Sequence, residues 1–285
     1  MNCSTRTRAA LLAVALAWAS CTTAAAADED SPRAELATYG TLYGVGLGLY
    51  GSLQLDLNPR PAAWLTAACA GGALYGAIEL AGARQMTLAE VRLVGSSMAW
   101  AMVDTALVAF ALEHYDDDVG WYLFGAGALV ATAAVIAGPR LGLSAGEVSA
   151  INSGGLWAPV AGVLFGATIH ALDLDVLPET LLLFNLAGLT AGALISGAHH
   201  PSRDQVLYMD AGALLGSLGG GLVGVIVGTV VDSFEIGTGL TLAGMIGGAA
   251  LAVSLNGFDG GKATAGEEGA GGGATMMLPL LVGAF

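Results

Sequence analysis

Residues 202–232 read SRDQVLYMDAGALLGSLGGGLVGVIVGTVVD and carry a glycine at every fourth position from Gly212 to Gly228. Positions four apart lie nearly above one another on a helix, so these glycines form a narrow face that we call the glycine seam. In water each glycine would cost a helix roughly 1 kcal/mol relative to alanine. In lipid the backbone must satisfy its own hydrogen bonds, and small residues at this spacing let two helices pack closely. The segment therefore predicts a transmembrane helix with a glycine packing face.

The same pattern returns along the chain at intervals of 57 or 58 residues. Gly212 aligns with Gly154, Ser97 and Gly40. The next positions, four residues apart in each repeat, stay in the same register. The seam that we predict comprises Gly40, Gly44, Gly48, Gly154, Gly162, Gly166, Gly212, Gly216, Gly220, Gly224 and Gly228. This spacing predicts four helical-hairpin repeats packed through Gly/Ala seams.

Helix start signals follow the same interval. Thr87-x-x-Glu90, Ser144-x-x-Glu147 and Ser202-x-x-Gln205 each match a capping box, in which the hydroxyl accepts a first-turn N–H and the acid or amide binds back. In the first copy, Asp30 is the expected cap and Pro32 lies within the first turn.

Composition favours a membrane protein. Of the 285 residues, 55% are hydrophobic and 11% are charged, against about 25% charged in ordinary soluble domains. We predict an all-α membrane protein with eight helices of transmembrane length, at about 32–54, 62–82, 88–113, 119–138, 145–172, 178–197, 203–231 and 235–255. The fourth is expected to stop at Gly138, just before Pro139. The net charge of −14 argues against nucleic acid as a partner.

The segments outside the helices suggest a domain organisation. Residues 1–27 resemble a secretory signal peptide, with Arg6 and Arg8 before an apolar run and small residues near its end. An eight-helix membrane domain spans 28–258, with repeats at about 30–86, 87–143, 144–201 and 202–258. A Gly-rich linker at 259–274 and an apolar segment at 275–285, ending in Phe285, complete the chain. An uncleaved first membrane helix and lipidation at Cys21 are the alternatives for the N-terminus.

One stretch favours a different fold. Residues 52–57, SLQLDL, alternate polar and apolar as a half-buried strand does, and a terminal aromatic is typical of outer-membrane β-barrels. Long stretches that are apolar on every face argue against a full barrel, whose strands alternate throughout.

Charge places the helix ends on two sides. Arginines gather at the side that holds the termini, and acidic turns such as Asp116 to Asp118 gather at the other. The positive-inside rule puts the basic side in the cytoplasm, whereas a signal peptide puts it outside. An outer-membrane location would remove this conflict, and we expect it over the inner membrane.

Four polar residues are candidates for an intramembrane site: Asp104, Asn152, Asn185 and Asp210. An ionisable or amide group at membrane depth is costly to bury and marks either a functional path or an interhelical hydrogen bond. We consider the interhelical role the more common one. No His or Cys spacing indicates a metal site, and we expect no cofactor.

These observations favour a non-enzymatic bacterial envelope protein that contacts membrane lipids, self-associates and has a structural or lipid-organising role. The alternative is a transporter or channel with a polar path near Asp104.

Overall fold

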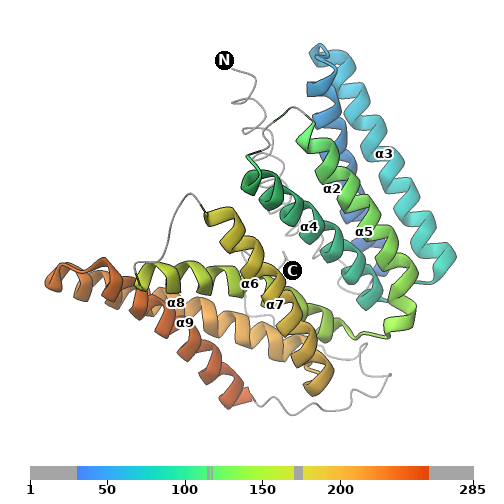
Figure 1. Cartoon of the computed structure of the whole chain (residues 1–285). Helices are drawn as coiled ribbons and strands as arrows, with labels where there is room; N and C mark the ends of the chain where they lie inside the picture. The colour runs from blue at the N-terminus through green and yellow to red at the C-terminus, as the bar shows by residue number, and fades with distance from the viewer. Residues whose placement is uncertain (1–30, 114–115, 117, 170–175, 257–285) are drawn as a thin grey trace. The chain divides into compact units, whose positions relative to one another are not determined.

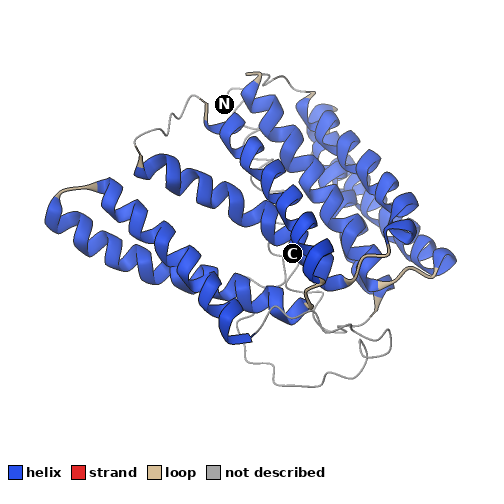
Figure 2. Cartoon of the chain, turned by 60° about the horizontal axis from the view of Figure 1, so that its bottom comes forward, coloured by secondary structure: helices blue, strands red, loops and turns tan. Residues whose placement is uncertain are grey.

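The computed structural model describes residues 31–113, 116, 118–169 and 176–256. Every regular element within these ranges is an α-helix, and none of their residues is in a strand (Figure 2). The helices are α2 (Pro32–Gln54), α3 (Pro59–Arg84), α4 (Leu88–Ala111), α5 (Val119–Leu141), α6 (Ala145–Thr168), α7 (Leu177–His199), α8 (Arg203–Val231) and α9 (Phe234–Asn256). Within the described residues, the prediction of an all-helical protein with eight long helices is confirmed. The predicted signal peptide, Gly-rich linker and C-terminal segment lie outside the described residues.

Three of the helices begin as predicted. Thr87, Ser144 and Ser202 each accept the N–H of the third helical residue, and the side chain of that residue accepts the backbone N–H of the cap. All three capping boxes are therefore formed. The predicted cap at Asp30 is wrong, because Ser31 precedes α2 and accepts the N–H of Ala34. Pro32 fits directly after it, since the first helical N–H has no partner within the helix.

One other sequence prediction is also wrong, and one alternative fold signal finds no support. Helix α5 does not stop at Gly138 but continues through Pro139 to Leu141, where Gly142 ends it at φ 58°. Glycine has no Cβ and adopts this left-handed conformation without strain, so the stop lies one turn later than expected. The alternating stretch 52–57 forms no strand. Helix α2 runs through Gln54, and a turn follows in which Asp56 has φ 48°.

Seven of the eight helices are both long enough and apolar enough to cross a membrane. Helix α2 is the exception. It has 23 residues, a sufficient length, but Tyr39, Tyr43, Tyr50 and its many glycines lower its hydropathy. The prediction that all eight helices would have membrane-spanning character therefore holds for seven by this measure.

Consecutive helices pair as hairpins, and glycines lie where their backbones meet. On α2, Gly40, Gly44 and Gly48 lie against the backbone of α3 at Ala73, Cys69 and Thr66. A Cβ added to Gly40 would stand only 2.8 Å from the carbonyl oxygen of Ala73. These positions therefore admit no side chain unless the two helices separate.

The α8–α9 hairpin has the most glycine contacts of this kind. Gly212, Gly216, Gly220 and Gly224 lie in turn against α9 at Gly248, Gly244, Leu240 and Gly237, and Gly228 lies against Ser233 in the turn before α9. In the α6–α7 hairpin, Gly154 meets Gly188, while Gly162 lies under the ring of Phe184. Gly166 is a partly buried residue of α6.

The chain divides into two compact units. Unit 1 contains α2 to α5, drawn from blue to green in Figure 1, and unit 2 contains α6 to α9, drawn from yellow-green to red. In unit 1, α2 contacts α4 and α5 as well as its partner α3. A buried apolar cluster lies among these helices and includes Leu36, Ala77, Ala81, Met86, Val91, Val94 and Ala134. In unit 2, α6 contacts all three other helices.

The most deeply buried valines mark equivalent places in successive hairpins. Val91, Val148 and Val206 are exposed by 0, 1 and 1%, respectively, and each is the fourth residue of the helix that opens its hairpin. They are separated by the same 57 and 58 residues as the capping boxes. One turn from the helix start, each of these hairpins therefore buries the same residue type.

Candidate functional site

Helix α6 carries the polar contacts of unit 2. Asp210, eight residues into α8, accepts hydrogen bonds from two side chains of α6 on the same carboxylate oxygen, Oδ1. The hydroxyl of Ser153 donates one, and the indole Nε1 of Trp157 donates the other over 2.9 Å. A carboxylate with two donors in a low-dielectric setting forms stronger bonds than neutral groups do. Asp210 therefore links α8 to α6.

Asn185 makes a second contact with the same stretch of α6. It lies on α7, is 1% exposed, and donates from Nδ2 to the carbonyl oxygen of Gly155 over 3.0 Å. Its other polar atom, Oδ1, is buried and has no hydrogen-bond partner among the described residues. Asn152, also on α6, is 3% exposed and lies next to Ser153.

Three of the four predicted polar residues thus converge on residues 152–157 of α6. We call Asn152, Ser153, Trp157, Asn185 and Asp210 the α6 polar cluster. The sequence placed Asn152 and Asp210 at equivalent positions of their helices, but it did not indicate that Asp210 would meet the residue beside Asn152. Ser153 and Trp157 were missed as bonding partners. The available signal was position, since Ser153 follows Asn152, which lies one 58-residue interval before Asp210.

Asp104, the fourth predicted polar residue, lies in unit 1. It is far in sequence from the other three, the nearest of which is Asn152. Asp104 lies two-thirds of the way along α4 and is partly buried. Its Oδ1 atom is buried and has no hydrogen-bond partner among the described residues. Asp104 lies in unit 1, whereas the α6 polar cluster lies in unit 2.

Unit 1 also contains an ion pair that the sequence analysis missed. The Nε atom of Arg92 on α4 lies 3.2 Å from Oε1 of Glu35 on α2, and both side chains are mostly buried. The hydroxyl of Tyr39 donates to the same oxygen over 2.9 Å. Glu35 and Arg92 are again 57 residues apart, so opposite charges at one repeat position were the signal that could have revealed the pair.

A further polar contact lies at the helix ends of unit 2. Nδ1 of His200, which caps α7, lies 2.7 Å from Oε1 of Glu147 in the first turn of α6. The Glu147 side chain is nearly buried, while that of His200 is mostly exposed. The contact becomes an ion pair when His200 is protonated. It holds the end of α7 to the start of α6.

The arrangement supports hydrogen bonding between helices. The described residues contain no group of three or more His, Cys, Asp and Glu side chains that could hold a metal ion. No protein-family model, curated protein or solved structure matches the chain. The functional argument therefore rests on the fold and on these contacts.

Proposed function

We propose that this chain is a non-enzymatic integral membrane protein of the bacterial envelope with a structural or lipid-organising role. Its seven long apolar helices indicate an integral membrane protein. The observation that supports a structural role is the α6 polar cluster, in which Asp210 and Asn185 bond to neighbouring helices. In lipid, such bonds hold helices together, because the alternative is a polar group without a partner in hydrocarbon.

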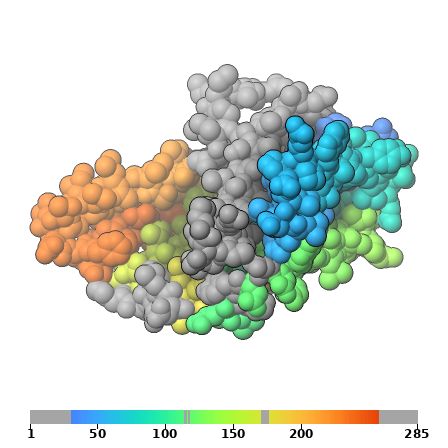
Figure 3. All heavy atoms as spheres, turned by 90° about the horizontal axis from the view of Figure 1, so that it is seen from above, coloured from blue at the N-terminus to red at the C-terminus, as the bar shows by residue number. Residues whose placement is uncertain are grey.

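The outward surface of the α8–α9 hairpin supports contact with lipid. Large apolar residues are exposed along the whole length of α8, including Leu215, Leu218, Leu222, Val225 and Val230, each exposed by 62% or more. The atoms of this hairpin appear in orange and red in the space-filling view (Figure 3). A surface this apolar is costly in water and favourable against acyl chains.

Self-association remains part of the proposal, through the outer faces of the hairpins. The seam glycines of α2 and α8 lie against α3 and α9, so a second copy would meet the outer apolar faces of these hairpins. Chemical cross-linking in nanodiscs that hold single or multiple chains would test this. A chain that stays monomeric at high density would contradict it.

An all-helical fold suits the inner membrane, and our sequence-based preference for the outer membrane has no support from the structure. Arg33 lies in the first turn of α2 and Arg92 lies just after the first turn of α4, while Arg84 and Arg140 lie in the last turns of α3 and α5. Because antiparallel hairpins bring these four ends to one side of unit 1, the positive-inside rule favours a cytoplasmic location for that side. We therefore propose the inner membrane.

Membrane fractionation on a density gradient tests this location. We expect the protein in the inner-membrane fraction, with the loop at Asp116 accessible to protease only from the periplasm. Recovery in the outer-membrane fraction with residues 1–27 removed would instead support our original sequence-based expectation.

The structural role predicts that purified chain in sealed vesicles conducts no ions or small solutes. The alternative, a transporter or channel, is favoured by one observation, the buried Oδ1 of Asp104 without a described partner. Flux through the wild type that Asp104→Asn abolishes, while an Asp204→Asn control at the start of α8 leaves it unchanged, would favour transport. Absence of flux in all three proteins would favour the structural role.

A further inference from the structure

Unit 1 contains a cavity between α2, α3 and α4. Its volume is about 140 Å³, and it opens partly to the outside. The lining is apolar apart from the tyrosine hydroxyls: Leu36, Tyr39, Gly40, Tyr43, Gly76, Ala77, Leu80, Val94 and Met98. Apolar cavities of about 150 Å³ in proteins hold groups of the size of benzene. This cavity can therefore take several methylene groups of a hydrocarbon chain.

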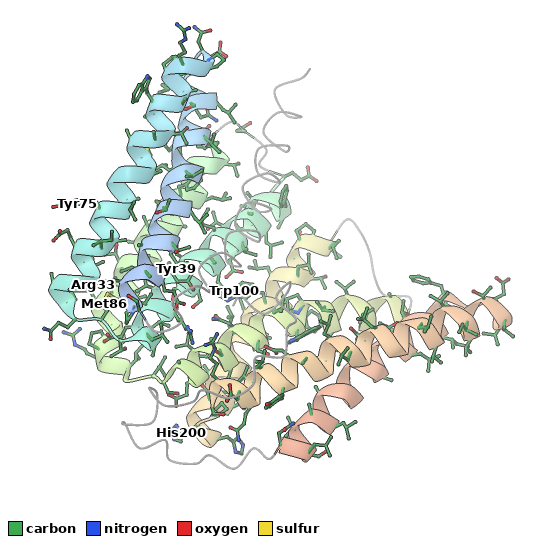
Figure 4. The ribbon with its side chains drawn as sticks, turned by 180° about the vertical axis from the view of Figure 1, so that it is seen from behind. Arg33, Tyr39, Tyr75, Met86, Trp100 and His200 are labelled. Carbon is green, nitrogen blue, oxygen red and sulfur yellow. The ribbon has the colours of Figure 1, made fainter. Side chains whose placement is uncertain are left out.

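One arginine, Arg84, stands one helical turn beyond the cavity. Arg33 precedes Leu36 on α2, but its guanidinium lies against Gly82, which at about 100° per residue points some 120° outside the arc that Gly76, Ala77 and Leu80 span on α3. Arg84 follows Leu80 by four residues, so it lies on the same face of α3, one turn nearer the helix end. Both arginines are exposed, and neither has an ion pair with a described residue. Figure 4 shows Arg33 at the same end of unit 1 as Tyr39 and Met86.

The neighbouring acids form no ion pair with Arg84 within the described residues. Glu35 is already paired with Arg92. Glu90 caps α4 through its bond to the backbone N–H of Thr87. At about 100° per residue, Glu79 points some 60° outside the arc that Gly76, Ala77 and Leu80 span on α3, whereas Arg84 falls inside it. The charged side chain that is left without an ion pair on the cavity side of α3 is therefore the cation Arg84.

We propose that this cavity binds an acyl chain of an anionic phospholipid whose headgroup phosphate is held by Arg84. The inference rests on the proposed membrane location and specifies the lipid-organising role. Basic pockets between membrane helices bind anionic lipid headgroups, because the guanidinium fork matches phosphate oxygens and the apolar walls accept the chain. The half-open shape fits a chain that is buried along part of its length and touches bulk lipid beyond it.

Gly76 allows the cavity to be filled without disturbing the helices. It lines the cavity, and a Cβ added there would meet no atom within 4 Å. Gly72, one turn earlier on α3, has the same free space but does not line the cavity. Gly76→Leu and Gly72→Leu are thus a matched pair that differ in cavity filling alone.

The test is lipid retention by the full chain. The protein is equilibrated in detergent micelles with equal amounts of phosphatidylglycerol and phosphatidylcholine, washed, and the retained lipids are counted by mass spectrometry. We expect phosphatidylglycerol to be enriched on the wild type and on Gly72→Leu, and to be lost from Gly76→Leu. Arg84→Gln should lower the enrichment about fivefold, as expected for one basic residue near an anionic lipid, whereas Arg33→Gln should leave it unchanged. Arg140→Gln, on α5 at the same end of unit 1, should leave the enrichment unchanged.

Three outcomes would overturn the proposal. The first is equal retention by Gly76→Leu and Gly72→Leu, which would show that no chain enters the cavity. The second is equal retention of the two lipids by the wild type. The third is lipid retention that appears only after residues 259–285 are deleted, which would identify the chain's own terminal segment as the occupant. Alkaline carbonate extraction of membranes separates the two hypotheses, because a protein that is extracted contradicts the membrane proposal itself.

Discussion

The contact between opening helices is built differently in the two units. In unit 1 the ring of Tyr39 on α2 lies against Gly95 of α4, so closely that a Cβ on Gly95 would come within 2.5 Å of it. In unit 2 the corresponding positions, 114 and 115 residues later, are Ser153 on α6 and Asp210 on α8, which share a hydrogen bond. In unit 1 the large Tyr39 ring fills the space beside Gly95, which has no side chain. In unit 2 two small polar side chains fill it.

This difference shows that the positions at which two helices meet do not decide which kind of interaction forms there. The two pairs occupy the same place along their helices, yet one contact is packing and the other is a charge-assisted hydrogen bond. Unit 1 places its polar bonds one turn nearer the helix ends, at Glu35 and Arg92. The hairpin spacing fixes which positions meet, while the residues at those positions decide how they interact.

The largest loss of stability is expected when the close glycine contacts within hairpins are removed. Both units share these contacts. Gly44→Leu in unit 1 and Gly216→Leu in unit 2 each drive a side chain into the backbone of the partner helix. Overpacking costs about 1–3 kcal/mol and occasionally more, and a backbone obstacle belongs at the upper end. We expect no folded protein by size-exclusion chromatography in detergent.

Gly219→Leu is the matched control for Gly216→Leu, because a Cβ at Gly219 meets nothing within 4 Å. It should elute as the wild type does. Equal tolerance of Gly216→Leu and Gly219→Leu would mean that the helices of this hairpin are not held by glycine contacts.

A second prediction places the residue pair found in unit 2 at the corresponding positions of unit 1. Gly95→Asp places an acid against the Tyr39 ring, and we expect a loss of roughly 3 kcal/mol from steric overlap and an unpaired carboxylate. Adding Tyr39→Ser recreates the pair found in unit 2 and should restore more than half of the loss. Thermal unfolding of the single and double variants measures the coupling. If the two changes add independently, the positions are not in contact.

A third prediction removes the polar link of unit 2. Asp210→Ala leaves the Trp157 indole N–H without an acceptor and should lower stability by about 1–3 kcal/mol. Ser153→Ala should cost less, since Asp210 keeps its bond from Trp157. Urea unfolding in mild detergent, followed by tryptophan fluorescence, provides the measurement. A larger loss for Ser153→Ala than for Asp210→Ala would contradict this ranking.

The smallest expected loss of stability should be the same in both units. Thr87→Ala in unit 1 and Ser144→Ala and Ser202→Ala in unit 2 each remove a capping hydroxyl. Each change should cost about 1 kcal/mol, seen as a small fall in the unfolding midpoint. A much larger loss at Ser144 would assign additional stability to the adjacent Glu147–His200 contact, which the capping box orients.

The sequence predicted the helices well, because their signals are local. A hydroxyl three residues before an acid or amide sets the start of α4, α6 and α8 wherever the rest of the chain lies. Errors arose where two local signals compete, as at Pro139 and Gly142. The polar contacts were harder to predict, because they depend on which faces of distant helices meet. Asp210 was recognisable as costly to bury, but its partners Ser153 and Trp157 became evident only once α6 and α8 were placed together.

The close fit of α2 against α3 also provides a chemical reporter. Cys69 is the only cysteine within the described residues, and its Cβ lies beside Gly48 while its carbonyl oxygen faces Gly44. A maleimide needs room at the sulfur, which this hairpin leaves only in part. The rate of alkylation at Cys69 should therefore follow the opening of the first hairpin, and thiol labelling would time that event separately from unfolding of the whole chain.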